Sequence, residues 1–153
     1  MSWKSRKQFL KAQKLLEAND LTGAEQIFSE VIERDQKSAE AFLHRAYIRT
    51  RLNKLDEALS DADTGIHLRP ENGVMYMIRG EIQLEKKNYR EAFDSLQKAC
   101  GLEKDNGRAF FHLGRATLGL SRKAEAADYF ETALQFERDY CLAQSMAENY
   151  ACN

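Results

Sequence analysis

Apolar and small residues recur along this chain with a helical spacing and with a second, longer period of 34 residues. Alanine marks the period at Ala24, Ala58, Ala92 and Ala126. Two more sets of residues follow the same period. One contains small residues, at Ala12, Ala46, Gly80 and Gly114. The other contains mostly bulky apolar residues, at Gln8, Phe42, Tyr76 and Phe110. Within each period, apolar residues at i, i+3 and i+4 predict two amphipathic helices. A fixed period of about 20–50 residues indicates stacked repeats, so we expect an all-α solenoid.

These columns resemble the tetratricopeptide repeat, a helix–turn–helix unit of the same length. Four units cover residues 5–38, 39–72, 73–106 and 107–140. The second unit matches the family pattern best, at Phe42, Ala46, Leu55, Ala58, Gly65 and Pro70. Two features depart from it: the closing proline occurs only at Pro70, and the aromatic residue late in the first helix is replaced by Leu15, Arg49, Gln83 and Thr117. The resemblance implies one domain over 1–153, a right-handed α-solenoid of antiparallel helix pairs.

Turn residues and the end of the chain complete the predicted architecture. We expect Asn19 and Asn53 to adopt the left-handed conformation that ends a helix, and Asn72-Gly73 and Asn106-Gly107 to break the chain between repeats for the same reason. Residues 139–150 carry Leu142, Met146 and Tyr150 on one helical face. They predict a capping helix, because terminal repeats of solenoids need a polar outer face. The alternative is the first half of a further repeat.

Charge and composition exclude several function classes. The net charge is −1, which does not favour nucleic acid as a partner. No apolar run approaches the ~18 residues of a transmembrane helix, so we expect no membrane insertion. The first residues lack the apolar core of a signal peptide, although a trimmed secreted protein would look the same. Cys100, Cys141 and Cys152 have no CxxC spacing and suit a reducing compartment, which predicts a cytoplasmic location.

No constellation of residues points to catalysis or to a cofactor. His44 and His112 lie two repeats apart, which does not bring them to one metal. Glu81 and Glu85 are i, i+4 on one helix and have no third ligand nearby in the sequence. Phosphate loops and nucleophile elbows are absent from the sequence. We therefore expect a protein that is not an enzyme and that holds no metal or cofactor.

The first helices of the repeats (the A helices) are basic and the second helices (the B helices) are acidic. The A halves hold 11 Lys or Arg against 4 Asp or Glu, and the B halves hold 11 against 19. In the family the A helices line a concave groove, but the charges at the groove positions balance. Arg45, Arg49 and Arg79 fall on flanking or packing positions, where their stems can run along the helix seam.

The groove positions of the family instead show a stripe of large apolar residues with arginines beside it. The predicted peptide-binding residues are Phe9, Leu43, Tyr47, Arg51, Met77, Glu81, Leu84, Arg108, Phe111 and Arg115. A large apolar stripe on a wet face suggests a surface for a partner. The alternative is a register that differs by one residue, in which case the apolar members are ordinary core.

The resemblance predicts an adaptor that binds a peptide or helix from another protein. Family members that clamp the acidic carboxyl tails of cytosolic chaperones use Lys, Asn and Arg at five positions. Those positions hold Phe9, Gln13, His44, Val74 and Ile78 here, so a clamp of that type is not expected. Two alternatives stay open: a self-associating scaffold segment, that is a homo-oligomer, and a small chaperone dedicated to a secretion or assembly substrate.

Overall fold

The computed structural model of this protein describes residues 3–136, with side chains from Arg6 onward. That part of the chain forms eight helices and no strand. Their bounds are α1 (Trp3–Glu17), α2 (Leu21–Arg34), α3 (Ala39–Arg51), α4 (Leu55–Leu68), α5 (Gly73–Glu85), α6 (Tyr89–Leu102), α7 (Gly107–Gly119) and α8 (Lys123–Phe136). The predicted all-α class is confirmed. The predicted helix at 139–150 lies outside the described residues, as do Cys141 and Cys152.

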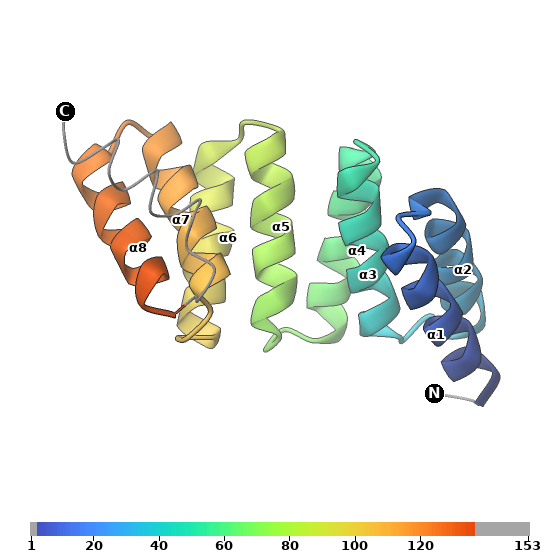
Figure 1. The fold of residues 1–153 in the computed structure, drawn as a ribbon. Helices are drawn as coiled ribbons and strands as arrows, with labels where there is room; N and C mark the ends of the chain where they lie inside the picture. The colour runs from blue at the N-terminus through green and yellow to red at the C-terminus, as the bar shows by residue number, and fades with distance from the viewer. Residues whose placement is uncertain (1–2, 137–153) are drawn as a thin grey trace. The chain divides into compact units, whose positions relative to one another are not determined.

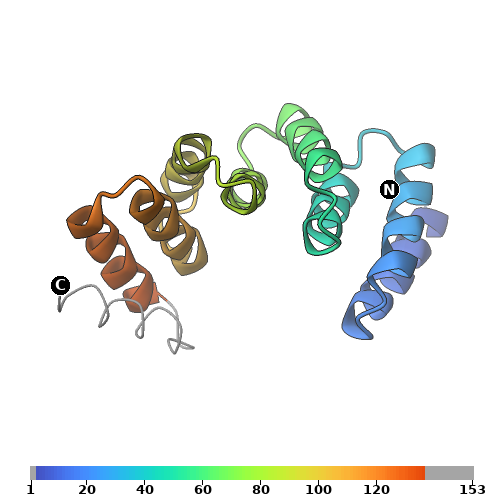
Figure 2. The same ribbon diagram turned by 90° about the horizontal axis from the view of Figure 1, so that it is seen from above.

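The chain divides into two compact units, Met1–Glu71 and Asn72–Asn153, called here the N-terminal and the C-terminal unit. The N-terminal unit contains the helical hairpins α1–α2 and α3–α4, with α2 packed against α3 (Figure 1). The C-terminal unit contains the hairpins α5–α6 and α7–α8, with α6 packed against α7. Figure 2 shows the same hairpins from above. Each unit therefore repeats one helix–turn–helix motif.

Each A helix is joined to its B helix by a turn with a residue in the left-handed conformation. The φ angles are 58° at Asn19, 59° at Asn53, 59° at Lys87 and 63° at Ser121. These four positions are 34 residues apart, so the turn belongs to the repeat. The prediction for Asn19 and Asn53 is confirmed. Lys87 and Ser121 show that the turn forces this conformation even on residues that favour it less than asparagine or glycine.

The breaks before α5 and α7 have a different cause from the one the sequence predicted. Asn72 and Asn106 both have φ of −85°, and no glycine has a positive φ within the described chain. The Asn72 side chain accepts hydrogen bonds from the backbone N–H of Val74 and Met75, and Asn106 accepts one from Ala109. The two asparagines are therefore N-caps, which satisfy free donors in the first helical turn.

The small-residue column of the A helices lies where the A and B helices of a hairpin cross. Ala12, Ala46, Gly80 and Gly114 are buried, and the 34-residue register sets them opposite a B-helix column of Phe28, Ala62, Leu96 and Phe130. A Cβ atom added to Gly80 would lie 2.4 Å from Cγ of Leu96. A Cβ atom added to Gly114 would lie 2.6 Å from the ring of Phe130. At these two crossings the partner's side chain lies directly over the glycine and occupies the space that a Cβ atom would need.

The lengths and compositions of the described helices show whether any of them could cross a membrane. None of α1–α8 combines the length and the apolar composition that a bilayer crossing requires. The predicted organisation as one domain over 1–153 stays a prediction.

The crossing at Gly80 generates a stability prediction with a matched control. We expect Gly80→Val to lower the free energy of unfolding by about 1–3 kcal/mol, because the new side chain overpacks against Leu96. Gly101 lies in α6 of the same unit and has nothing within 4 Å of an added Cβ. Gly101→Val should therefore cost much less. Urea denaturation followed by circular dichroism at 222 nm measures both, and equal losses would contradict the crossing geometry.

Candidate functional site

Four predicted groove residues belong to the N-terminal unit and differ in accessibility. Phe9 is 7% exposed, Leu43 and Tyr47 are half-buried, and Arg51 is exposed. The guanidinium of Arg51 lies 6.0 Å from the centre of the Tyr47 ring, a cation–π contact. Arg51 also donates a hydrogen bond of 3.1 Å to Oδ1 of Asn19. Leu43, Tyr47 and Arg51 therefore keep accessible surface, whereas Phe9 belongs to the core.

Phe9 is held in an aromatic cluster with Phe28 and His44. Its ring meets both neighbours edge-on, with centroids 5.2 Å from Phe28 and 5.1 Å from His44. His44 stacks on Phe28 with centroids 5.1 Å apart. Burial lowers the pKa of His44, although the charge of Glu40 opposes the shift. His44 therefore packs as one ring of this cluster.

In the C-terminal unit, Met77 and Leu84 are 5% and 6% exposed and belong to the core. Phe111 is half-buried; its centroid lies 5.7 Å from that of Phe130 and 5.4 Å from that of His112. Of the apolar residues predicted here, Phe111 alone keeps a substantial accessible surface. The predicted peptide-binding role of the buried residues stays a prediction.

The charged groove residues of α5 and α7 form one cluster around Glu81. Oε1 of Glu81 lies 2.7 Å from Nε2 of His112 and 2.9 Å from Nη2 of Arg108. Both nitrogens lie within ion-pair distance of that oxygen, although neither N–H bond is well aligned with it. Arg115 continues the cluster, 3.6 Å from the carboxylate of Glu85 and 3.3 Å from Nδ1 of His112.

The environment of Glu81 favours its ionised form. Burial opposes ionisation, but the contact with His112 and the charges of His112 and Arg108 outweigh burial and hold the pKa of Glu81 below its ordinary value. Glu81, Arg108 and Arg115 were predicted from the sequence; His112 was not. A signal for His112 exists, because it follows Arg108 by four residues and precedes Arg115 by three, which places all three on one helical face.

The sequence placed Arg45 and Arg49 on packing positions, and the structure shows what they bind there. Arg45 makes two parallel hydrogen bonds to Asp61, of 2.8 and 2.7 Å, and a third of 3.1 Å to the hydroxyl of Ser29. Arg49 lies 2.9 Å from Asp61 and 2.9 Å from Glu25. Both arginine side chains are about 15% exposed, so the pairs are largely desolvated. We call this set the arginine network.

Glu25 links α2 to α3 within the arginine network. Its carboxylate contacts Arg49 and lies 2.7 Å from Nζ of Lys54. Burial opposes ionisation of Glu25, but hydrogen bonds from Lys54 and Arg49 outweigh it and lower the pKa. Asp61 is the residue that the sequence reasoning passed over. It stands on the buried face of α4 beside Ala58, Ala62 and Gly65, where a carboxylate requires a cation.

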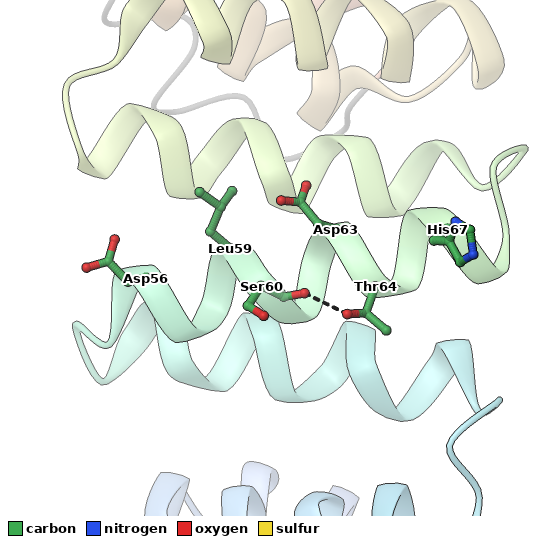
Figure 3. Close-up of a pocket in the computed structure, with 6 residues that line it drawn as sticks. All are labelled: Asp56, Leu59, Ser60, Asp63, Thr64 and His67. Carbon is green, nitrogen blue, oxygen red and sulfur yellow. Dashed lines mark hydrogen bonds between the residues drawn. The ribbon is translucent and has the colours of Figure 1, made fainter.

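The surface hollow on α4 is open to solvent and offers no catalytic constellation. The hollow drawn in Figure 3 is lined by Asp56, Leu59, Ser60, Asp63, Thr64 and His67, all along one face of α4. In it the Thr64 hydroxyl donates a hydrogen bond of 2.9 Å to the Ser60 carbonyl oxygen. Residues of one helix cannot enclose a small molecule. Within the described range, no three His, Cys, Asp or Glu side chains gather closely enough to hold a metal ion.

Comparison with known proteins gives a consistent family. A family model described as "tetratricopeptide repeat" matches residues 9–72 and 51–107. The Hsp70-Hsp90 organizing protein of Triticum aestivum is 25% identical over 122 residues, which are 80% of this chain and 21% of that protein. The chain spans about a fifth of the length of the first curated relatives it matches.

Solved structures share the fold. A tetratricopeptide-repeat protein of Thermus thermophilus superposes with a TM-score of 0.85 at 15% identity, covering 97% of this chain and 81% of that one. The first repeat domain of Spaghetti (RPAP3), solved with the HSP90 peptide SRMEEVD, gives 0.73 at 21% identity, covering 77% and 96%. These likenesses show that the chain has the helical-repeat fold of those structures.

The arginine network generates a prediction at Asp61. We expect Asp61→Asn to lower the free energy of unfolding by about 3 kcal/mol, since it leaves two largely buried guanidinium groups without their shared carboxylate. Glu57 also contacts Arg49, at 3.2 Å, but its side chain is 55% exposed. Glu57→Gln should cost less than about 1 kcal/mol. Chemical denaturation of both variants tests the difference, and a mild Asp61→Asn variant would contradict it.

The Glu81 cluster generates a prediction on acid stability. Because the folded state lowers the pKa of Glu81, its ionised form adds stability at neutral pH, and this contribution disappears as the pH falls below about 4.5. We expect Glu81→Gln to flatten the loss of unfolding free energy between about pH 5 and pH 3. Glu85→Gln, at an exposed carboxylate, is the control. An unchanged slope in Glu81→Gln would show that the cluster adds no stability.

Proposed function

The chain belongs to the tetratricopeptide-repeat family, and on that premise we propose that it is a non-enzymatic adaptor that binds a peptide or helix of another protein. The binding surface would be formed, within each unit, by the accessible residues of the A helices: α1 and α3 in one unit, α5 and α7 in the other. The single observation that carries the proposal is the half-buried Phe111 between the cations Arg108 and Arg115 on α7.

The chemistry of this surface in the C-terminal unit favours an apolar anchor with acidic or carbonyl neighbours. Phe111 offers a partly exposed ring that is already fixed against Phe130, so little side-chain entropy would be lost on binding. Arg108 is about half exposed and shares the charge of Glu81 with His112. Guanidinium groups next to an aromatic ring are frequent anchors of protein interfaces.

The N-terminal unit repeats this arrangement with other residues. Leu43 and Tyr47 on α3 supply partly accessible apolar surface, and Arg51 extends beside Tyr47. Among the described residues, Arg51 contacts the Asn19 amide and the Tyr47 ring and forms no ion pair with a carboxylate. Both units therefore combine an aromatic side chain with an accessible arginine.

The ligand chemistry should differ from that of the relative solved with the HSP90 peptide SRMEEVD. At the positions where such clamps carry Lys, Asn and Arg, Phe9 and His44 here form an aromatic cluster and Ile78 is buried. A terminal carboxylate would find no cation at those places. The partner is better described as an extended or helical segment with a large apolar side chain.

We place this adaptor in a reducing compartment, the cytoplasm, with neither catalysis nor nucleic acid binding. Burial raises the pKa of the Cys100 thiol to about 12, so at neutral pH this cysteine is not the thiolate that nucleophilic catalysis needs. The net charge of −1 favours no polyanion.

Truncating one aromatic residue in each unit tests the proposal. We expect Tyr47→Ala with Phe111→Ala to lose the partner that the wild-type chain retains in affinity capture from its source cells, with affinity for the recovered partner segment falling at least about tenfold. Quantitative mass spectrometry of the captured proteins, then calorimetry with the recovered segment, provides the measurement.

The control is Leu102→Ala, which removes an exposed leucine of α6 outside the A helices. It should retain the partner, and circular dichroism should show that all variants stay folded. Equal retention by the double variant, or loss with Leu102→Ala alone, would place the binding surface elsewhere.

A further inference from the structure

The outer face of α1 differs from the same face of the other A helices. In α3 the positions that correspond to Lys7 and Lys14 hold Ala41 and Ile48, both fully buried. In α7 they hold Ala109 and Ala116, which are also fully buried. On α1 the lysines are exposed, and between them Leu10 is 53% exposed. This face is lined by Lys7, Gln8, Leu10, Lys11 and Lys14, and we call it the α1 end face.

The last described helix, α8, has a side that corresponds to the side of α2 facing α3. In α2, Glu25 and Ser29 face α3 and bond to its arginines. The corresponding residues of α8 are Ala127 and Glu131, on the helix side that no further described helix follows. Asp128 and Glu131 are exposed there, and Ala127 and Leu134 are half-buried. We call Ala127, Asp128, Glu131 and Leu134 the α8 end face.

The 34-residue register shows how these two faces would pair. Arg45 Nη1 donates to Ser29 Oγ at 3.1 Å across the α2–α3 junction. In the first A helix the residue at the repeat position of Arg45 is Lys11, and in the last B helix the residue at the repeat position of Ser29 is Glu131. A contact between the two ends in the same register would therefore pair Lys11 with Glu131, which carry opposite charges. The Arg49–Glu25 pair of the same junction, at 2.9 Å, becomes Leu15 with Ala127, two apolar residues. These two junction contacts thus have chemically compatible counterparts, in addition to the exposed Leu10.

We propose that the α1 end face of one copy of this chain packs on the α8 end face of a second copy, continuing the repeat register from chain to chain. The contact is head-to-tail, so the assembly extends as an open series or closes into a ring of copies. This inference does not depend on the adaptor function, because neither end face contains Tyr47, Phe111 or their arginines.

The chain's own continuation fits this place less well than α1 does. In the small-residue column, the position after Gly114 is Glu148, whereas the A helix of a second copy brings Ala12, which is fully buried in its own hairpin. At the described crossings this column holds only alanine or glycine. Residues 139–150 could cover α8 in another register, and the experiment below separates that outcome.

Size and charge determine the expected strength of the contact. One helix on another buries less than the roughly 1,600 Å² of a standard stable interface, so association should be weak and rise with concentration. Ion pairs such as Lys11–Glu131 are screened by salt, so association should weaken as the salt concentration rises.

The experiment is sedimentation velocity of the full chain over a dilution series from about 10 μM to 1 mM. We expect a weight-average mass that rises continuously with concentration. Lys11→Glu alone and Glu131→Lys alone should each weaken association at least about fivefold, by placing like charges together. Both changes in one chain should restore it, because the exchanged charges attract again. Lys98→Glu, at an exposed lysine of α6, changes the charge equally and should have no effect.

Two results would overturn the proposal. One is a monomer at every concentration, which would assign the α8 end face to the chain's own following residues. The other is association that neither single variant alters, which would assign the contact to another surface.

Discussion

The structure depends on the close crossing of the two helices in each hairpin. At Gly80 and Gly114 a single added Cβ atom would come within 2.4–2.6 Å of the opposing side chain. The close approach lets Leu96 and Phe130 of the B helices reach across to the A helices and become fully buried. In the second hairpin the crossing pairs Ala46 with Ala62, both fully buried, and leaves less apolar volume. That hairpin contains the arginine network.

The arginine network therefore holds α3 to α2 and α4 in the hairpin whose crossing contains the smallest side chains. Arg49 stands where the family pattern has an aromatic residue, and it binds Glu25 of the preceding hairpin and Asp61 of its own. An aromatic residue would fill space without directional contacts, whereas a guanidinium group imposes specific geometry on both neighbours. The cost is desolvation, which falls hardest on any variant that removes a single partner. Charge thus decides how α2, α3 and α4 are joined.

The sequence was sufficient for the helices, the hairpins and the left-handed turns at Asn19 and Asn53, because each depends on a local pattern repeated every 34 residues. The same turns at Lys87 and Ser121 were not predicted, since neither residue type favours that conformation. It was insufficient for Asn72 and Asn106, since an N-cap and a left-handed turn use the same residue type and only the backbone angle distinguishes them. For the predicted groove, Glu81, Arg108 and Arg115 could be grouped because they lie on neighbouring A helices. The burial of Phe9, Met77 and Leu84 could not be derived, because a small rotation of an amphipathic helix decides between surface and core. His44 and His112 show this limit most clearly: one repeat position gives an aromatic stacking partner in α3 and an ion-pair partner in α7.

The contrast between basic A helices and acidic B helices does not indicate a charged groove; it reflects ion pairs between neighbouring helices. Arg45 and Arg49 of α3 bind carboxylates of α2 and α4, so part of the positive charge of the A helices is used within the N-terminal unit. At α3, which has a B helix on both sides, the two signs meet and compensate each other. The first A helix and the last described B helix each have a neighbour on one side only, and there the asymmetry leaves exposed lysines on α1 and exposed carboxylates on α8. Polar ends keep a repeat protein soluble, but ends of opposite sign also attract each other. The charge pattern that joins hairpins within the chain is therefore the one that would join one chain to the next.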